Sequence, residues 1–129
     1  MILLDASVLI GHFERADAHH ADATALLRNH LSEVFASSVI TLAEVYAGAA
    51  RAGLADRLRQ LLTRLKIQTL DLPADAAPRL GELRAATKLK MPDCCVLYTA
   101  QRHGAAIATF DDRLAAHAAD LGVAVVTDE

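Results

Sequence analysis

Short apolar runs alternate along the chain with longer stretches in which Ala and Leu recur at helical spacing. Runs of a few apolar residues predict buried strands, and spacing of three to four predicts helices with one apolar face. This alternation favours an α/β fold, a three-layer α/β/α sandwich whose mainly parallel sheet has roughly five strands. The predicted strands are residues 1–4, 33–36, 67–72, 105–109 and 123–126, and the predicted helices include residues 19–31, 41–51, 54–66, 73–88, 91–103 and 111–121.

The first apolar run meets a carboxylate at Asp5 and turns apolar again at Val8. The intervening Ala6 and Ser7 suit a helix start, where side-chain oxygens accept free backbone N–H groups. We therefore expect Asp5 at the carboxyl end of a strand, the edge at which open α/β sheets bind ligands. An acid in this position is partly buried and needs a hydrogen bond or a cation.

Three further acids are expected at the same sheet edge. Asp111 follows the strand at 105–109, Asp93 opens a helix directly after Pro92, and Glu44 lies near the start of another helix. Taken singly, Asp93 and Asp111 are also ordinary helix-capping residues. Gathered together, like charges raise one another's pKa and require compensating cations. An all-oxygen set favours Mg²⁺ or Mn²⁺ over zinc.

Length and composition suit one compact domain over residues 1–129, because 53% of the chain is hydrophobic. No secretory leader pattern is present, and no apolar run approaches the roughly 20 residues that cross a bilayer. The adjacent Cys94 and Cys95 cannot form an ordinary long-range bridge with each other, which agrees with a reducing compartment. We expect a cytoplasmic protein without membrane contact, whose cysteines lie in the core.

Charge is unevenly distributed along the chain. Residues 1–50 and 91–129 each carry a net charge of −4, whereas residues 51–90 carry +5. Acidic ends and a basic middle suit a metal site beside a surface that binds a polyanion, although solvated helix faces explain the same pattern. The six histidines lack metal-site spacing and are expected at the surface or at helix ends. No Walker-type loop or Gly-x-Ser-x-Gly elbow supports a nucleotide triphosphatase or a serine hydrolase.

Four motifs in the chain together resemble the acidic motifs of the PIN domain, and more closely the small VapC-type toxin ribonucleases. They are LDASVLI at 4–10, TLAEVYAG at 41–48, MPD at 91–93 and ATFDDRL at 108–114. Their order and spacing match the family over almost the whole chain. The resemblance implies a metal-binding catalytic centre made of four acids, supported by two hydroxyls: Asp5, Glu44, Asp93 and Asp111, with Ser7 and Thr109.

The fourth motif holds two adjacent acids, Asp111 and Asp112. Asp111 fits the family pattern better, because it stands two residues beyond Thr109 at the strand end. Asp112 is expected to cap the following helix or to hold metal through water.

By resemblance, the chain is a Mg²⁺- or Mn²⁺-dependent endoribonuclease and the toxin of a type II toxin–antitoxin pair. The partners implied are RNA, a small cognate antitoxin and a second copy of the chain. Four basic residues are candidate phosphate contacts, and their spacing also fits a solvated helix face: Arg51, Arg57, Arg59 and Arg64.

Other functions stay open at this stage. A PIN-fold scaffold that binds RNA without catalysis, or a structure-specific DNA nuclease, would share most of these features. A phosphoacceptor receiver domain fits less well, because Lys88 and Lys90 precede a helix instead of ending a late strand.

Overall fold

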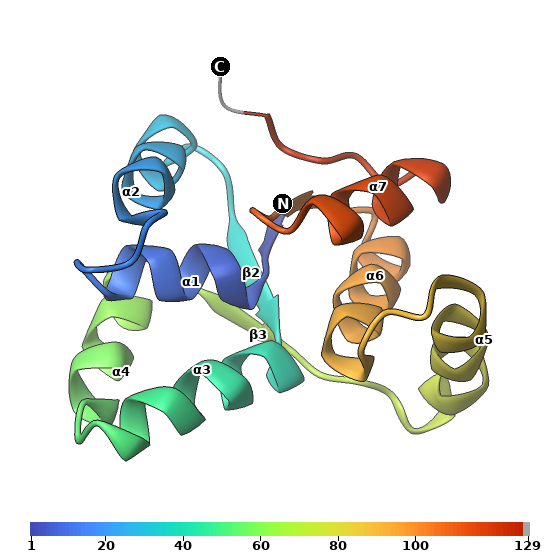
Figure 1. Ribbon diagram of the computed structural model, residues 1–129, viewed down its shortest axis with the longest axis horizontal. Helices are drawn as coiled ribbons and strands as arrows, with labels where there is room; N and C mark the ends of the chain where they lie inside the picture. Colours follow the sequence, from blue (N-terminus) through green and yellow to red (C-terminus); the bar gives the residue numbers. More distant parts are fainter. Residues whose placement is uncertain (128–129) are drawn as a thin grey trace.

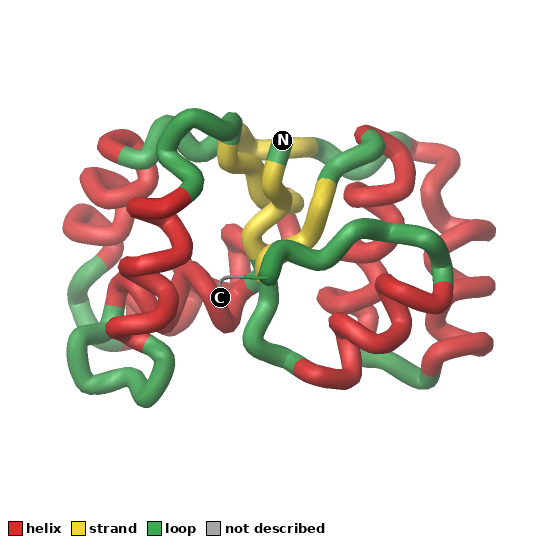
Figure 2. The backbone as a smooth tube through the Cα atoms, turned by 90° about the horizontal axis from the view of Figure 1, so that it is seen from above, coloured by secondary structure: helices red, strands yellow, loops and turns green. Residues whose placement is uncertain are grey.

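The computed structural model describes residues 1–127, in which four parallel strands form one sheet with helices on both faces (Figure 1). Seen from above, the sheet lies between two groups of helices (Figure 2). The strands, in the order β3-β2-β1-β4, are β1 Ile2–Leu4, β2 Phe35–Ser38, β3 Gln68–Leu70 and β4 Ala106–Ala108. The helices are α1 Ala6–Phe13, α2 His20–Asn29, α3 Val39–Arg51, α4 Ala55–Arg64, the 3₁₀ turn η1 Ala74–Ala76, α5 Ala77–Thr87, α6 Met91–His103 and α7 Asp112–Asp120.

The central strand β1 determines where the loops converge. It pairs in parallel with β2 through Ile2 and Phe35, and with β4 through Leu4 and Ala108. The carboxyl ends of β1, β2 and β4 therefore lie at one edge of the sheet. The chain enters α1, α3 and the start of α7 from this edge.

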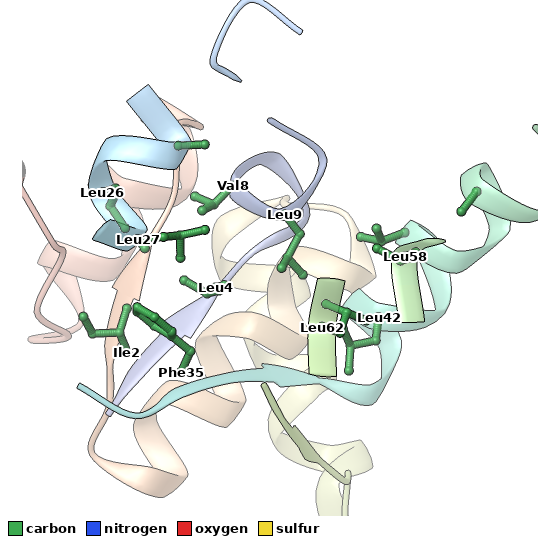
Figure 3. Close-up of a cluster of buried hydrophobic side chains, with 14 residues drawn as sticks. Ile2, Leu4, Val8, Leu9, Leu26, Leu27, Phe35, Leu42, Leu58 and Leu62 are labelled. Atoms are coloured by element: carbon green, nitrogen blue, oxygen red, sulfur yellow. The ribbon is translucent and has the colours of Figure 1, made fainter. Parts of the chain in front are cut away.

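Side chains of β1 alternate between two cores, as the period of a strand requires. Ile2 and Leu4 face the cluster on one side, together with Phe35 of β2, Ala108 of β4 and apolar residues of α1, α2, α3 and α4 (Figure 3). Leu3, which is 0% exposed, packs on the other side with residues of α5, α6 and α7. Burial on both faces explains why the strand that precedes Asp5 is continuously apolar. Cys94 and Cys95 are buried on α6, as expected.

The second strand begins later than the sequence suggested. Residues 33–36 were expected in the strand, but the strand runs from Phe35 to Ser38. Ser37 is fully buried and its hydroxyl donates to the carbonyl of Leu4 at 2.9 Å, which satisfies a polar group inside the sheet. Ser38 does cap a helix, because its hydroxyl accepts from the backbone N–H of Ile40 at 3.2 Å. Consequently α3 starts at residue 39.

Two other elements differ from expectation. The helix predicted over residues 73–88 is divided into η1 and α5, with Pro78 in the first turn of α5. The strand predicted at residues 123–126 is reduced to one parallel bridge between Ile107 and Val125, since only that pair takes strand register. Val125 nevertheless occupies the fifth position of the sheet, beside β4. In residues 1–127 no helix has both the length and the apolar character that crossing a membrane requires.

Candidate catalytic site

Asp5 is the buried acid of the site. It follows β1 and caps α1, and only 4% of it is exposed. One carboxylate oxygen, Oδ1, accepts from the Ser7 hydroxyl at 2.6 Å and from the backbone N–H of Val8 at 3.1 Å. The other oxygen accepts from the Thr109 hydroxyl. Burial raises the pKa of Asp5, while these hydrogen bonds oppose the rise by favouring the carboxylate.

Ser7 and Thr109 join the first and fourth sequence motifs. The backbone N–H of Phe110 donates to the Ser7 hydroxyl at 3.0 Å, and that of Asp111 donates to the Thr109 hydroxyl at 2.9 Å. Each hydroxyl thus donates to Asp5 and accepts from the loop that carries Asp111. The carboxyl end of β1 is thereby fixed to the carboxyl end of β4.

Asp111, not Asp112, caps α7. Its Oδ1 accepts from the backbone N–H groups of Arg113 at 2.9 Å and Leu114 at 3.2 Å. Asp112 is the first residue of the helix and is exposed. The capping role expected of Asp112 therefore belongs to Asp111, because the chain leaves β4 in extended conformation and turns helical only after residue 111.

Asp93 and Glu44 are the other two predicted acids. It lies half-buried in the first turn of α6, and Glu44 lies exposed on α3. Burial raises the pKa of Asp93, and the negative charges of Asp111, Asp5 and Glu44 raise it further. Only Lys90 acts in the opposite direction among the charges that affect this group. The charges of the other three predicted acids therefore all reach Asp93.

The donor chemistry of this group suits a hard divalent cation, because all four acids are oxygen ligands and their repulsion favours a positive ion. As the side chains stand in residues 1–127, no three Asp, Glu, His or Cys groups are close enough to share one ion directly. Mg²⁺ usually retains several waters and binds through one or two carboxylates. A set of carboxylates spaced around a site fits that mode of binding better than the tight cage of a structural metal.

The four predicted phosphate contacts do not form one surface. Arg59 makes an ion pair with Asp56 at 2.5 Å and lines a groove with Tyr46 and Lys66. Arg51 is the exposed last residue of α3. Arg57 and Arg64 line a different cavity, at the side of α1.

Two features near the acids were missed by the sequence analysis. Lys90 precedes α6, its carbonyl accepts from the backbone N–H of Asp93 at 3.0 Å, and its charge lowers the pKa of that acid. Its position two residues before Pro92 was the available signal. His19 stacks on Phe110 with ring centroids 4.5 Å apart and planes inclined by 6°. This pair joins residues distant in sequence, so nothing local indicated it.

Comparison with known proteins gives the same family as the motifs. The family model of the PIN domain matches residues 2–120. A chain of a toxin–antitoxin complex from Klebsiella pneumoniae is 30% identical, with 86% of this chain and 87% of that chain covered and a TM-score of 0.69. FitAcB from Neisseria gonorrhoeae is 28% identical, with 98% and 97% covered and a TM-score of 0.73.

A further structure shares the fold at lower identity. Mycobacterium tuberculosis VapC20, a sarcin–ricin loop cleaving toxin, is 18% identical over 99% of this chain and 100% of that chain, with a TM-score of 0.80. No protein of curated function matches the chain. Family model, fold and relatives agree, and the chain belongs to the PIN-domain family, in which it resembles the VapC-type toxins.

Proposed function

We propose that this protein is a divalent-metal-dependent endoribonuclease that acts as the toxin of a toxin–antitoxin pair. The observation that carries the proposal is that the charges of Asp5, Glu44 and Asp111 all act on Asp93, in a chain of the PIN-domain family. Because only one lysine of the described chain lies near the four acids, a bound cation would relieve the repulsion among their charges.

In this mechanism Asp5, Asp93 and Asp111 would hold Mg²⁺ or Mn²⁺, with Glu44 completing the site. The ion would supply an activated water and neutralise the charge that develops on the scissile phosphate. Asp5 keeps its carboxylate in one orientation, because Ser7, Val8 and Thr109 donate to it. The resulting rigidity serves catalysis, since a fixed ligand needs no reorganisation during the reaction.

The protons of the reaction are handled by the same carboxylates. Asp93 binds a proton more readily than an exposed aspartate, because burial and three neighbouring acids raise its pKa. We assign the proton of the attacking water to Asp93, whose carboxylate lies within electrostatic reach of the other three acids.

The relatives support a proposal for the substrate and the partners. VapC20 cleaves the sarcin–ricin loop, and the Klebsiella relative is part of a toxin–antitoxin complex. For this chain we propose single-stranded or looped RNA as the substrate and a cognate antitoxin as the partner. We also propose that the protein acts in the cytoplasm and assembles as a homodimer. Gel filtration of the purified chain at micromolar concentration tests the dimer directly, and a monomer would contradict it.

The test of activity uses end-labelled single-stranded RNA and DNA with Mg²⁺, and then with excess chelator. We expect the wild type to cut RNA only when Mg²⁺ is present, and Asp5→Asn to be inactive although folded. Asp75→Asn, which removes an exposed acid from η1, is the matched control and should retain activity. Cleavage of DNA in preference to RNA would indicate a DNA nuclease, and no cleavage of either would indicate a binding scaffold.

A further inference from the structure

A second cavity, of about 400 Å³, lies where the carboxyl end of α1 meets α2 and α4. Its lining contains five side chains that are cationic or become so on protonation. No acidic residue of the described chain lines it. The five are Arg15, Arg57, Arg64, His12 and His20. A cavity with such a lining attracts anions.

The two histidines are held in fixed positions. The Nδ1 atom of His20 donates to the carbonyl of Gly11 at 2.9 Å, and Nδ1 of His12 lies 2.9 Å from the hydroxyl of Thr24. The rings stack with centroids 6.3 Å apart and planes inclined by 6°. Burial and the neighbouring His20 lower the pKa of His12, so the permanent positive charge of the cavity comes from its arginines. Because these contacts engage Nδ1, the Nε2 atom of each ring is left for another partner.

The arginines of the cavity are similarly uncompensated. Arg57 and Arg64 are seven residues apart on α4, which places them on the same side of the helix two turns apart. Neither makes an ion pair with any described residue, whereas Arg59 on the same helix is neutralised by Asp56. A guanidinium group binds phosphate oxygens through two parallel hydrogen bonds. Two arginines of α4 without an ion-pair partner therefore line this cavity, and Arg64 also borders a neighbouring cavity that contains Glu33.

The cavity and the four acids lie at opposite ends of one helix. Asp5 caps the start of α1 and His12 lies in its last turn, so the rise along the helix separates these positions by about 10 Å. A polyanion is repelled by the acids, and its affinity must come from cations elsewhere. The lining of this cavity provides such cations within reach of a strand bound at the acids.

We infer that this cavity binds a backbone phosphate of the RNA strand, away from the bond that is cut. The inference rests on the proposed ribonuclease function and adds a second contact to it. Phosphate is favoured over the carboxylates of a protein partner because the cavity lies one short helix away from the site at which the proposed function holds a phosphodiester. Its occupant would anchor the strand without taking part in the chemistry.

The experiment measures binding of a fluorescent single-stranded RNA 12-mer in excess chelator, as a function of KCl concentration. Arg57→Ala/Arg64→Ala is compared with Arg79→Ala/Arg102→Ala, which removes the same charge elsewhere and includes an arginine already paired with Glu82. Each phosphate that is no longer neutralised lowers the slope of log K against log salt by about 0.7, so the cavity variant, which loses one phosphate, should lose about 0.7. At 0.1 M salt that corresponds to binding weaker by roughly 5-fold.

A charge-preserving variant and thermal melting separate the loss of the phosphate contact from a loss of structure. Arg57→Lys/Arg64→Lys keeps the charges and should recover most of the slope, and thermal melting should match the wild type for all variants. Equal losses in both alanine pairs, or wild-type affinity and slope in the cavity variant, would overturn the inference. Displacement of the RNA by deca-glutamate as effectively as by unlabelled RNA would assign the cavity to an acidic peptide and overturn it too. If wild-type binding behaves as expected but Mg²⁺ produces no cleavage, the proposed function fails while the cavity remains a nucleic-acid site.

Discussion

Thr109→Val removes the hydroxyl that joins the first and fourth motifs while keeping the shape of the side chain. In the wild type this hydroxyl donates to the buried carboxylate of Asp5 and accepts from the backbone N–H of Asp111. Hydrogen bonds to charged groups contribute about 1.5–3 kcal/mol. Because Asp5 keeps its bonds from Ser7 and Val8, we expect the lower part of that range, about 2 kcal/mol less free energy of unfolding at pH 7.

The loss should depend on pH. Burial already raises the pKa of Asp5 above that of the unfolded chain, and losing the Thr109 bond raises it further. A group whose folded pKa is raised stabilises the fold below the unfolded pKa, and this contribution is lost as pH rises through the folded pKa. The difference between variant and wild type is therefore largest at neutral pH and shrinks towards pH 4.

Urea unfolding followed by circular dichroism at pH 7 and pH 4 measures both quantities. Thr63→Val is the control, because its exposed hydroxyl bonds only to the carbonyl of Arg59 one turn earlier, and it should change stability by less than about 0.5 kcal/mol. An equal loss at both pH values, or no loss at pH 7, would refute the role assigned to this hydrogen bond.

Three other perturbations have expected outcomes. Mg²⁺ at 100 times its dissociation constant should stabilise the wild type by about 2.7 kcal/mol in a thermal melt, and Asp93→Asn should reduce that gain; an identical gain would place the ion elsewhere. Leu3→Ala should cost about 2–5 kcal/mol in urea unfolding because Leu3 is 0% exposed, whereas Leu31→Ala, at a position 66% exposed, should cost little. His12→Gln should flatten the pH dependence of stability, because the pKa of His12 is lowered in the folded protein. The contribution of His12 to stability is complete above the unfolded pKa and is lost as pH falls, so an unchanged profile between pH 7 and pH 5 would contradict this.

The sequence predicted much of the fold because local signals agreed with the tertiary environment. Pro92 and Gly104 bracket α6 within a residue of the expected limits, and the apolar run before Asp5 became β1. Ser37 contradicted its local propensity, since a buried hydroxyl is satisfied only by the Leu4 carbonyl of the neighbouring strand. That bond joins residues 33 apart and has no local signature.

The sequence predicted which strand ends carry the acids, but it did not predict the contacts between the side chains of the site. Parallel strands place their carboxyl ends together, so Asp5 and Asp111 were expected at one edge without any knowledge of side chains. The hydrogen bond between Thr109 and Asp5 spans 104 residues of sequence and depends on the exact pairing of β1 with β4. On α4 the spacing of three residues allows the ion pair between Asp56 and Arg59, but nothing local indicates that Arg57 lines a cavity with residues of α1 and α2.

The rate of RNA cleavage as a function of Mg²⁺ concentration tests the central claim most directly. For the wild type, the initial rate on labelled single-stranded RNA should rise with Mg²⁺, reach saturation and vanish in chelator. Asp93→Asn should lower the saturated rate at least about 100-fold, as expected for loss of a proton-accepting and ion-holding group, while Asp75→Asn follows the wild-type curve. Cleavage that persists in chelator, or an Asp93→Asn curve that overlays that of the wild type, would contradict the account.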